Sequence, residues 1–327
     1  MDSNINKNAR RIDIHHHIVP DFYAKAIEEN GAYSNKWPVP TWSVEQAKEH
    51  MSILGIETAI VSVPTPGAKI YEDNKEKRRI LVRKLNEFMG DLVKNNPKEF
   101  GFFASLPSLT DVEGTLNEIN YVHSTLKPDG YLLFTSYGNG QYLGHPSFKA
   151  IWTKLNELKA AVFIHPCEAS TTVAIEYLPP PLLDFPHETT RTASDIVLSG
   201  TRAACPDIKI ILSHAGGTLP FLARRITMAG AIPSLHCPRQ PEQILSDFRS
   251  FYYDTALSSS VPQLQALLHF ADPSKIIFGS DIPYAPLSVT LDYSKSLDTF
   301  FLNQFQNFSQ AINRENAKKL FPDKFTD

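Results

Sequence analysis

Near its amino terminus the chain reads Arg11-Ile12-Asp13-Ile14-His15-His16-His17, in which apolar and polar residues alternate as they do in a β-strand. Residues two apart in a strand face the same side. Asp13, His15 and His17 are therefore predicted to project from one face and His16 from the other. Two imidazoles on one face of a short strand supply half of a metal site, so we expect other strands to supply the rest.

Apolar runs of strand length recur along the chain, and longer helical patterns separate them. The predicted strands are Arg11–His15, Thr58–Val63, Phe100–Leu106, Gly130–Thr135, Ala161–His165, Lys209–His214, Phe251–Thr255 and Lys275–Gly279. The predicted helices are Val44–Leu54, Asn74–Asn95, Asp111–Leu126, Ser147–Leu158, Glu188–Ala204, Leu219–Ala229, Pro262–Phe270 and a segment that begins near Leu287. This alternation predicts right-handed βαβ units around a parallel sheet, and eight such units favour a (β/α)8 barrel of the TIM type.

A doubly wound open sheet is the alternative to the barrel. It usually has a glycine-rich turn after its first strand, whereas this chain continues with His16-His17-Ile18-Val19-Pro20. We therefore expect one barrel domain over residues 1–327, with a C-terminal helical tail. Two insertions, Asp21–Thr41 and Cys167–His187, follow the first and fifth strands on the side where barrel enzymes form their sites.

The composition excludes several classes of function. A formal net charge of −3 gives no basic surface for nucleic acid or for an anionic membrane. No apolar run approaches the roughly 20 residues of a membrane span. The three cysteines, Cys167, Cys205 and Cys237, have no Cys-x-x-Cys spacing and suit a reducing compartment. We expect a soluble, cytoplasmic protein.

Polar side chains directly follow four of the predicted strands, all at the same end of the barrel. They are His15, His17, His165, His214 and Asp281, from the first, fifth, sixth and eighth strands. Three histidines and one carboxylate suit a zinc ion with one position open for water or substrate. The remaining histidine, His214, is then available as an acid or base near neutral pH. One carboxylate against a dication leaves net positive charge, which suits an anionic substrate.

These strand ends resemble the metal-binding motifs of the amidohydrolase superfamily. The matching segments are Asp13–His17, Ile164–Pro166, Ser213–Gly217 and Gly279–Asp281. More narrowly, they are similar to its non-oxidative branch, which contains the aminocarboxymuconate-semialdehyde and hydroxybenzoate decarboxylases. Three segments, Asp13–Tyr23, Phe185–Thr192 and Phe278–Pro283, look most like the fungal 6-methylsalicylate decarboxylase type.

The resemblance implies one divalent metal and no organic cofactor. Its ligands would be His15, His17, His165 and Asp281, with His214 as the catalytic partner. Zinc is the expected metal, and manganese is the alternative. Binuclear members of the superfamily have a carboxylated lysine at the end of the fourth strand, where this chain has Leu132-Leu133-Phe134-Thr135-Ser136-Tyr137, so a mononuclear site is expected.

The resemblance also implies a homodimer or a higher homo-oligomer. In the muconate-semialdehyde enzymes an arginine eleven residues after the sixth-strand histidine reaches the substrate carboxylate of a neighbouring subunit. Here that offset falls on Arg225, which would bind substrate, beside Arg224. A basic pair in a helix is also common on an ordinary solvated face.

The expected reaction is decarboxylation of a hydroxylated aromatic acid, 6-methylsalicylate or a related hydroxybenzoate, to CO2 and a phenol. Asp281 or His214 would deliver the proton to the ring carbon. Two alternatives stay open: a metal-dependent hydrolase of a lactone, amide or ester, and a metal-binding protein without catalysis. Aromatic residues of the insertions are candidate pocket walls, namely Trp37, Trp42, Tyr177 and Phe185. Asp13 either orients a metal ligand or hydrogen-bonds within the barrel.

Overall fold

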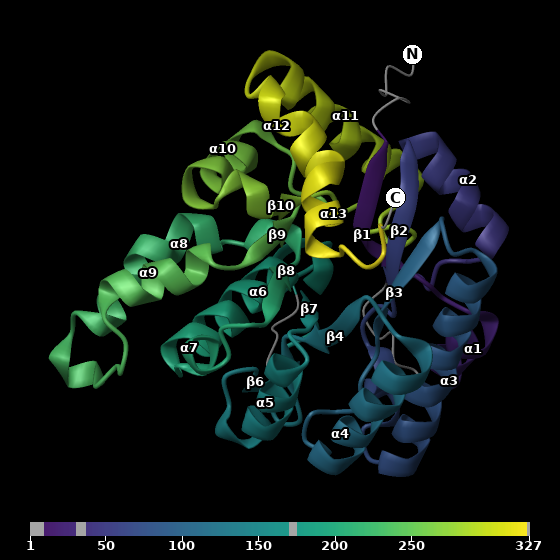
Figure 1. Ribbon diagram of the computed structural model, residues 1–327, viewed down its shortest axis with the longest axis horizontal. Coiled ribbons are helices and arrows are strands. Elements are labelled where there is room, and N and C mark those ends of the chain that lie inside the picture. Colours follow the sequence, from purple (N-terminus) through teal and green to yellow (C-terminus); the bar gives the residue numbers. More distant parts are fainter. Residues whose placement is uncertain (1–9, 31–36, 170–174, 326–327) are drawn as a thin grey trace.

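The computed structural model describes residues 10–30, 37–169 and 175–325. Eight parallel strands stand side by side in sequence order and form a barrel that helices surround (Figure 1). They are β1 (Arg11–His17), β2 (Ile56–Ser62), β3 (Phe100–Ala104), β4 (Gly130–Phe134), β7 (Ala161–His165), β8 (Lys209–Leu212), β9 (Tyr252–Asp254) and β10 (Ile276–Ile277). Hydrogen bonds from Ile14 N to Phe278 O (3.1 Å) and from His17 N to Ile282 O (2.8 Å) close the barrel between its last and first strands. The predicted (β/α)8 barrel is confirmed, and the open doubly wound sheet is excluded.

Helices follow the strands and cover the outside of the barrel (Figure 1). They are α1 (Asp21–Glu29), α2 (Val44–Leu54), α3 (Lys75–Asn95), α4 (Val112–Tyr121), α5 (Lys149–Glu157), α6 (Pro180–Leu198), α7 (Thr201–Ala204), α8 (Leu219–Ile226), α9 (Pro241–Arg249), α10 (Val261–Phe270), α11 (Leu287–Asn303), α12 (Gln306–Gln310) and α13 (Asn316–Leu320). The side chains of Ser43 and Asn74 accept hydrogen bonds from the first turns of α2 and α3, as N-cap residues do. None of the helices in the described ranges is both long and apolar enough to span a membrane.

Strand β1 differs from its prediction in length and in the direction of one side chain. It extends to His17, and it contains a bulge, because Asp13 pairs with Ala59 but His16 pairs with Val61. Asp13 Oδ2 consequently lies 3.1 Å from His16 Nδ1. Placing Asp13 on the same face as His15 and His17 was therefore wrong, since strict alternation holds only in a regular strand.

The two insertions contain more helix than the sequence indicates. Asp21–Thr41 contains α1, and Cys167–His187 contains the start of α6, which begins at Pro180. Proline is tolerated in the first turn of a helix because its missing N–H would be unpaired there anyway. Residues 31–36 and 170–174 of these insertions lie outside the described residues. Helix α9 has no counterpart among the predicted helices, since only Ile244 and Phe248 form its buried stripe.

The C-terminal segment closes the amino ends of the barrel strands. The fully buried side chain of Arg11 donates to Asp298 at 2.6 and 2.7 Å and to Asn313 Oδ1 at 3.2 Å. Lys324 donates to the backbone carbonyl of Phe100, the first residue of β3. Figure 1 shows α11, α12 and α13 lying together beside β1. The residues available for chemistry are thus those at the opposite, carboxyl ends of the strands.

Candidate metal centre

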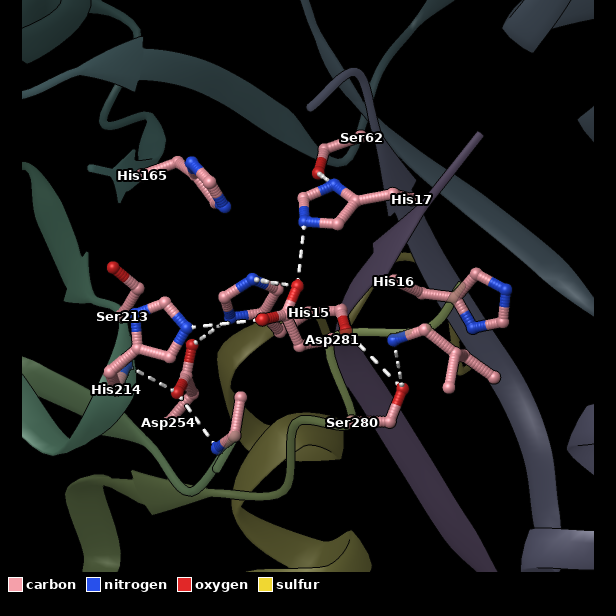
Figure 2. A network of polar contacts seen from close by, with 12 residues as sticks. His15, His16, His17, Ser62, His165, Ser213, His214, Asp254, Ser280 and Asp281 are labelled. Carbon is pink, nitrogen blue, oxygen red and sulfur yellow. Dashed lines mark hydrogen bonds and ion pairs between the residues drawn. The ribbon is translucent and has the colours of Figure 1, made fainter. Parts of the chain in front are cut away.

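Four of the predicted site residues meet at the carboxyl end of the barrel. His15 and His17 come from β1, His165 ends β7, and Asp281 follows β10. One ligand atom from each of these side chains lies within 4.8 Å of the others. Figure 2 shows the three imidazoles around the Asp281 carboxylate, with His16 pointing away from them.

Each of the three histidines has its Nδ1 atom held by a neighbouring group. His15 Nδ1 lies 2.7 Å from Asp254 Oδ2, and His165 Nδ1 lies 2.8 Å from the carbonyl oxygen of Pro166. His17 Nδ1 lies 3.2 Å from Ser62 Oγ. A carboxylate and a carbonyl can only accept, so Nδ1 of His15 and of His165 carries the proton. The Nε2 atoms are thereby left with lone pairs that can bind a metal.

The arrangement fits a divalent metal ion. His15 Nε2 is buried and has no hydrogen-bond partner in the described chain, although it lies 3.3 Å from Asp281 Oδ1. His17 Nε2 lies 3.1 Å from the same oxygen. A buried nitrogen without a partner costs free energy that coordination to a metal would recover. Three imidazoles and one carboxylate are a donor set for zinc or manganese.

Burial and the contacts among the charged side chains together set the protonation of this cluster. Burial and the neighbouring histidines hold the pKa of His165 well below its usual range, and burial lowers the pKa of His17. Both rings are therefore neutral near pH 7, as metal ligands must be. For His15, burial lowers the pKa, but Asp254 and Asp281 outweigh it and raise the pKa to about 10, so metal binding must displace the proton from its Nε2 atom. Burial raises the pKa of Asp281, and the surrounding histidines, His15 foremost, outweigh this and hold it well below its usual range.

His214 lies next to the cluster without being part of it. Its Nε2 atom is 3.3 Å from Asp281 Oδ2, and its Nδ1 atom is buried with no hydrogen-bond partner among the described residues. The backbone at His214 has a φ of +53°, a strained conformation that is uncommon for residues with a side chain. A hydrogen bond of 2.8 Å from its N–H to Asp254 Oδ1 holds it there.

Asp254 is a candidate functional residue that the sequence prediction missed. One carboxylate oxygen orients the His15 ring, while the other accepts from the backbone N–H of His214 and, at 3.0 Å, of Ala256. A single fully buried carboxylate thus positions one predicted metal ligand and the predicted catalytic histidine. The sequence does show an aspartate near the end of the seventh strand. It was missed because it lies inside the predicted strand Phe251–Thr255, whereas the site residues were sought directly after the strands.

A glycine lets the end of the eighth strand approach β1. A Cβ atom at Gly279 would lie 2.8 Å from His15 Cβ and 3.2 Å from Asp254 Cβ, closer than side chains pack. Asp13 fixes the same junction, because its Oδ1 accepts from the backbone N–H of Ser280 at 3.0 Å and of His15 at 3.0 Å. Of the two roles considered for Asp13, hydrogen bonding within the barrel is the one that the structure contains.

A cavity of about 310 Å³ opens directly onto the cluster. His17, His165, His214 and Asp281 line its floor. Its walls are mostly apolar and include Trp37, Pro66, Leu182, Phe185, Leu257 and Val289. Two of the four aromatic residues proposed as walls, Trp37 and Phe185, therefore line the cavity. The other two do not: Trp42 packs against Phe88 with ring centroids 5.9 Å apart, and Tyr177 is 88% exposed.

Arg225 does not line the cavity of its own chain. It is exposed on α8, as is Arg224. This helix follows the His214 turn, and Figure 1 shows α8 and α9 at the outer edge of the molecule. A contact between Arg225 and substrate would therefore have to involve a second copy of the chain, as the sequence prediction supposes.

Comparison with known proteins supports the same family. The family model described as amidohydrolase matches residues 12–322. The 6-methylsalicylic acid decarboxylase of Penicillium expansum is 40% identical over 315 residues, which cover 95% of this chain and 96% of that protein. A solved amidohydrolase II is 26% identical with a TM-score of 0.87, covering 95% of this chain and 99% of that one. The dihydroxybenzoic acid decarboxylase of Polaromonas sp. JS666, solved with manganese and 2-nitroresorcinol, is 21% identical with a TM-score of 0.80, covering 97% and 98%. The chain therefore belongs to the amidohydrolase family.

Proposed function

We propose that this protein is a metal-dependent, non-oxidative decarboxylase that converts a hydroxylated aromatic acid, 6-methylsalicylate or a related hydroxybenzoate, to CO2 and a phenol. The observation that carries the proposal is the cluster of three oriented histidines and one aspartate at the floor of a largely apolar cavity. The fungal relative named as a 6-methylsalicylic acid decarboxylase aligns with 95% of the chain. No redox or organic cofactor is required for this reaction.

The expected cofactor is one divalent metal held by His15, His17, His165 and Asp281. Zinc is our first choice because the donor set of three imidazoles and a carboxylate suits it. Manganese, which the Polaromonas enzyme contains, is the alternative. When bound, such an ion supplies positive charge that orients the carboxylate and ortho-hydroxyl of the substrate and stabilises negative charge on the phenolic oxygen.

The side chains of the protein perform the remaining tasks. Loss of CO2 requires a proton on the ring carbon that bears the carboxylate. The His214–Asp281 pair, with its 3.3 Å contact, is placed at the cavity floor to hold and deliver that proton. The apolar walls, Trp37 and Phe185 among them, exclude water and orient the ring.

We further propose that the active form is at least a homodimer. The surface around Arg225 on α8 exposes large apolar side chains that a second copy would cover, with Phe221 at 84%, Met228 at 54% and Leu235 at 57% exposed. In such a dimer Arg225 would reach the carboxylate of the neighbouring substrate. We also propose one barrel domain over residues 1–327 and a cytoplasmic location, which suits three free cysteines.

One experiment tests the proposed reaction. The metal-loaded protein is incubated with salicylate, 6-methylsalicylate and 2,6-dihydroxybenzoate, and the phenols are separated by chromatography while CO2 is trapped. We expect the decarboxylated phenol from at least one acid. A matched panel of lactones, amides and esters tests the alternative hydrolase, since the same metal would serve that chemistry. Hydrolysis of that panel without CO2 release from any acid would contradict the proposal.

A further inference from the structure

The cavity contains one lysine, Lys69, that neither the metal centre nor the proton transfer uses. Apart from histidines, it is the one basic side chain among the described residues that line the cavity. Most of the surrounding wall is apolar, so the ammonium group has few protein atoms with which to exchange hydrogen bonds. A cation in such a wall is stabilised by an anion that enters the cavity.

Lys69 is held in place by the structure around it. It lies on the 3₁₀ helix η1 (Gly67–Tyr71), which follows β2. The buried hydroxyl of Tyr23 donates to the carbonyl oxygens of Pro64 and Gly67, both at 3.2 Å, and so ties α1 to this segment. Gly67 has a φ of +59° and packs against the ring of Phe134, where a side chain would collide. The position of Lys69 at the cavity wall therefore depends on packing rather than on a flexible loop.

The protein offers Lys69 only a weak hydrogen-bond acceptor. Within the described ranges its Nζ atom makes one hydrogen bond, to Cys167 Sγ at 3.3 Å. Thiol sulfur is a poor acceptor, and an ammonium group has three donors. The nearby carboxylate of Glu188 accepts from the Tyr142 hydroxyl, which lies 3.1 and 2.9 Å from its two oxygens, and it forms no hydrogen bond with Lys69 within the described ranges. Two N–H groups of Lys69 are thus available to a ligand.

The contact with Cys167 places Lys69 near the strand that carries the His165 ligand. Cys167 is two residues beyond His165, and its backbone N–H donates to Thr135 Oγ1 at 3.1 Å. Lys69, in contact with its sulfur, is therefore at the same edge of the cavity as the His165 ligand. An aromatic acid bound in this cavity would share it with both the Lys69 ammonium group and the metal ligands.

We propose that Lys69 binds the carboxylate of the aromatic acid and selects anionic over neutral ring compounds. That the ligand is an aromatic acid rests on the proposed function. That the cavity prefers an anion rests on the presence of the Lys69 ammonium group in its wall. Because the carboxylate stays attached to the ring until the carbon–carbon bond breaks, we expect the contact to be present in both the bound substrate and the transition state. Removing it should raise KM and leave kcat within a few-fold of its original value.

The test compares binding of salicylate, an anion, with binding of salicylamide, its neutral analogue, to the metal-loaded protein by calorimetry. In Lys69→Met we expect salicylate to bind about 10- to 100-fold more weakly and salicylamide to bind as before. Lys69→Arg, which keeps the charge, should restore most of the salicylate affinity. Lys25→Met, which removes an exposed lysine on α1, is the control and should leave salicylate binding unchanged. Metal content and near-UV circular dichroism establish that each variant is folded and loaded, and Lys69→Gln replaces the Met variant if that one is not.

Equal losses for both ligands, or no loss for either, would overturn the proposal. A KM unchanged beside a large fall in kcat would also overturn it, since Lys69 would then act on the reaction and not on binding. The result of this binding test is independent of the result of the decarboxylation test. If the unaltered protein decarboxylates none of the acids, the proposed reaction fails. The role of Lys69 is still decided by comparing the salicylate and salicylamide affinities of the unaltered protein with those of the Lys69 variants.

Discussion

Arg11 and His15 lie toward opposite ends of strand β1 and are equally buried. They differ in how completely their side chains are hydrogen-bonded. Each nitrogen of the Arg11 guanidinium donates a hydrogen bond, with two bonds to Asp298, one to Asn313 and one to the carbonyl oxygen of Leu54. His15 has one nitrogen bound to Asp254 and the other without a hydrogen-bond partner in the described chain. Both side chains are 0% exposed. Burial therefore does not distinguish Arg11 from His15, whereas the hydrogen-bond partners of the two side chains do.

The first prediction removes a proposed ligand from the carboxyl end. His165→Ala should lose the metal and with it all measurable decarboxylation. Losing a group that merely orients a ligand typically costs about 10- to 100-fold, so losing a ligand should exceed that range. Mass spectrometry measures the metal content, and turnover of 6-methylsalicylate measures the decarboxylation. His145→Ala, an exposed histidine on the same chain, is the control and should retain both.

The second prediction separates the metal from the proton transfer. His214→Ala should keep its metal, because His214 is not among the four grouped side chains, but its kcat should fall about 100- to 10,000-fold. Metal content and kcat are measured on the same preparation. Turnover equal to that of the unaltered protein would remove His214 from the mechanism.

The third prediction concerns the amino end of β1. Arg11→Met should lower the free energy of unfolding by about 3–5 kcal/mol, since it leaves Asp298 and the Leu54 carbonyl without their partner. Urea unfolding followed by far-UV circular dichroism measures this. Arg10→Met is the control, because Arg10 makes an exposed ion pair with Glu57 that is worth at most about 1 kcal/mol. If folded Arg11→Met protein showed a reduced kcat/KM, the two ends of the strand would not be independent.

The fourth prediction concerns the residue that orients His15. Asp254→Asn should weaken metal binding about 10- to 100-fold while leaving the fold intact, because the His15 ring loses its carboxylate partner. Competition with a chelator gives the dissociation constant. Asp298→Asn, at the other end of β1, removes a carboxylate from Arg11 and should leave metal affinity unchanged. Equal effects of the two variants would mean that the loss is one of general stability.

The sequence was sufficient for the barrel and for the grouping of the site residues. His15, His165, His214 and Asp281 each follow an apolar run directly, and parallel strands bring such positions to one end of a sheet. The prediction that they meet required only the order of the strands and no knowledge of side-chain geometry. That is why it succeeded while finer details did not.

The details that the sequence did not reveal depend on local geometry. The bulge in β1 turns Asp13 toward His16, and nothing in the alternating pattern of residues indicates it. The contact of Asp254 with a metal ligand can be recognised only when the orientation of the His15 ring is known. Lys69 lies on a short 3₁₀ helix, which has no periodicity to recognise, and it reaches the cavity through packing around Gly67.

The closure of the barrel between its last and first strands has a consequence for biosynthesis. His15 and His17 belong to the first strand, whereas Asp281 follows the eighth. The four grouped side chains lie between His15 and Asp281, so a nascent chain on the ribosome has the complete set only after Asp281 has been added. Binding of the metal by all four side chains must therefore follow synthesis of the eighth strand.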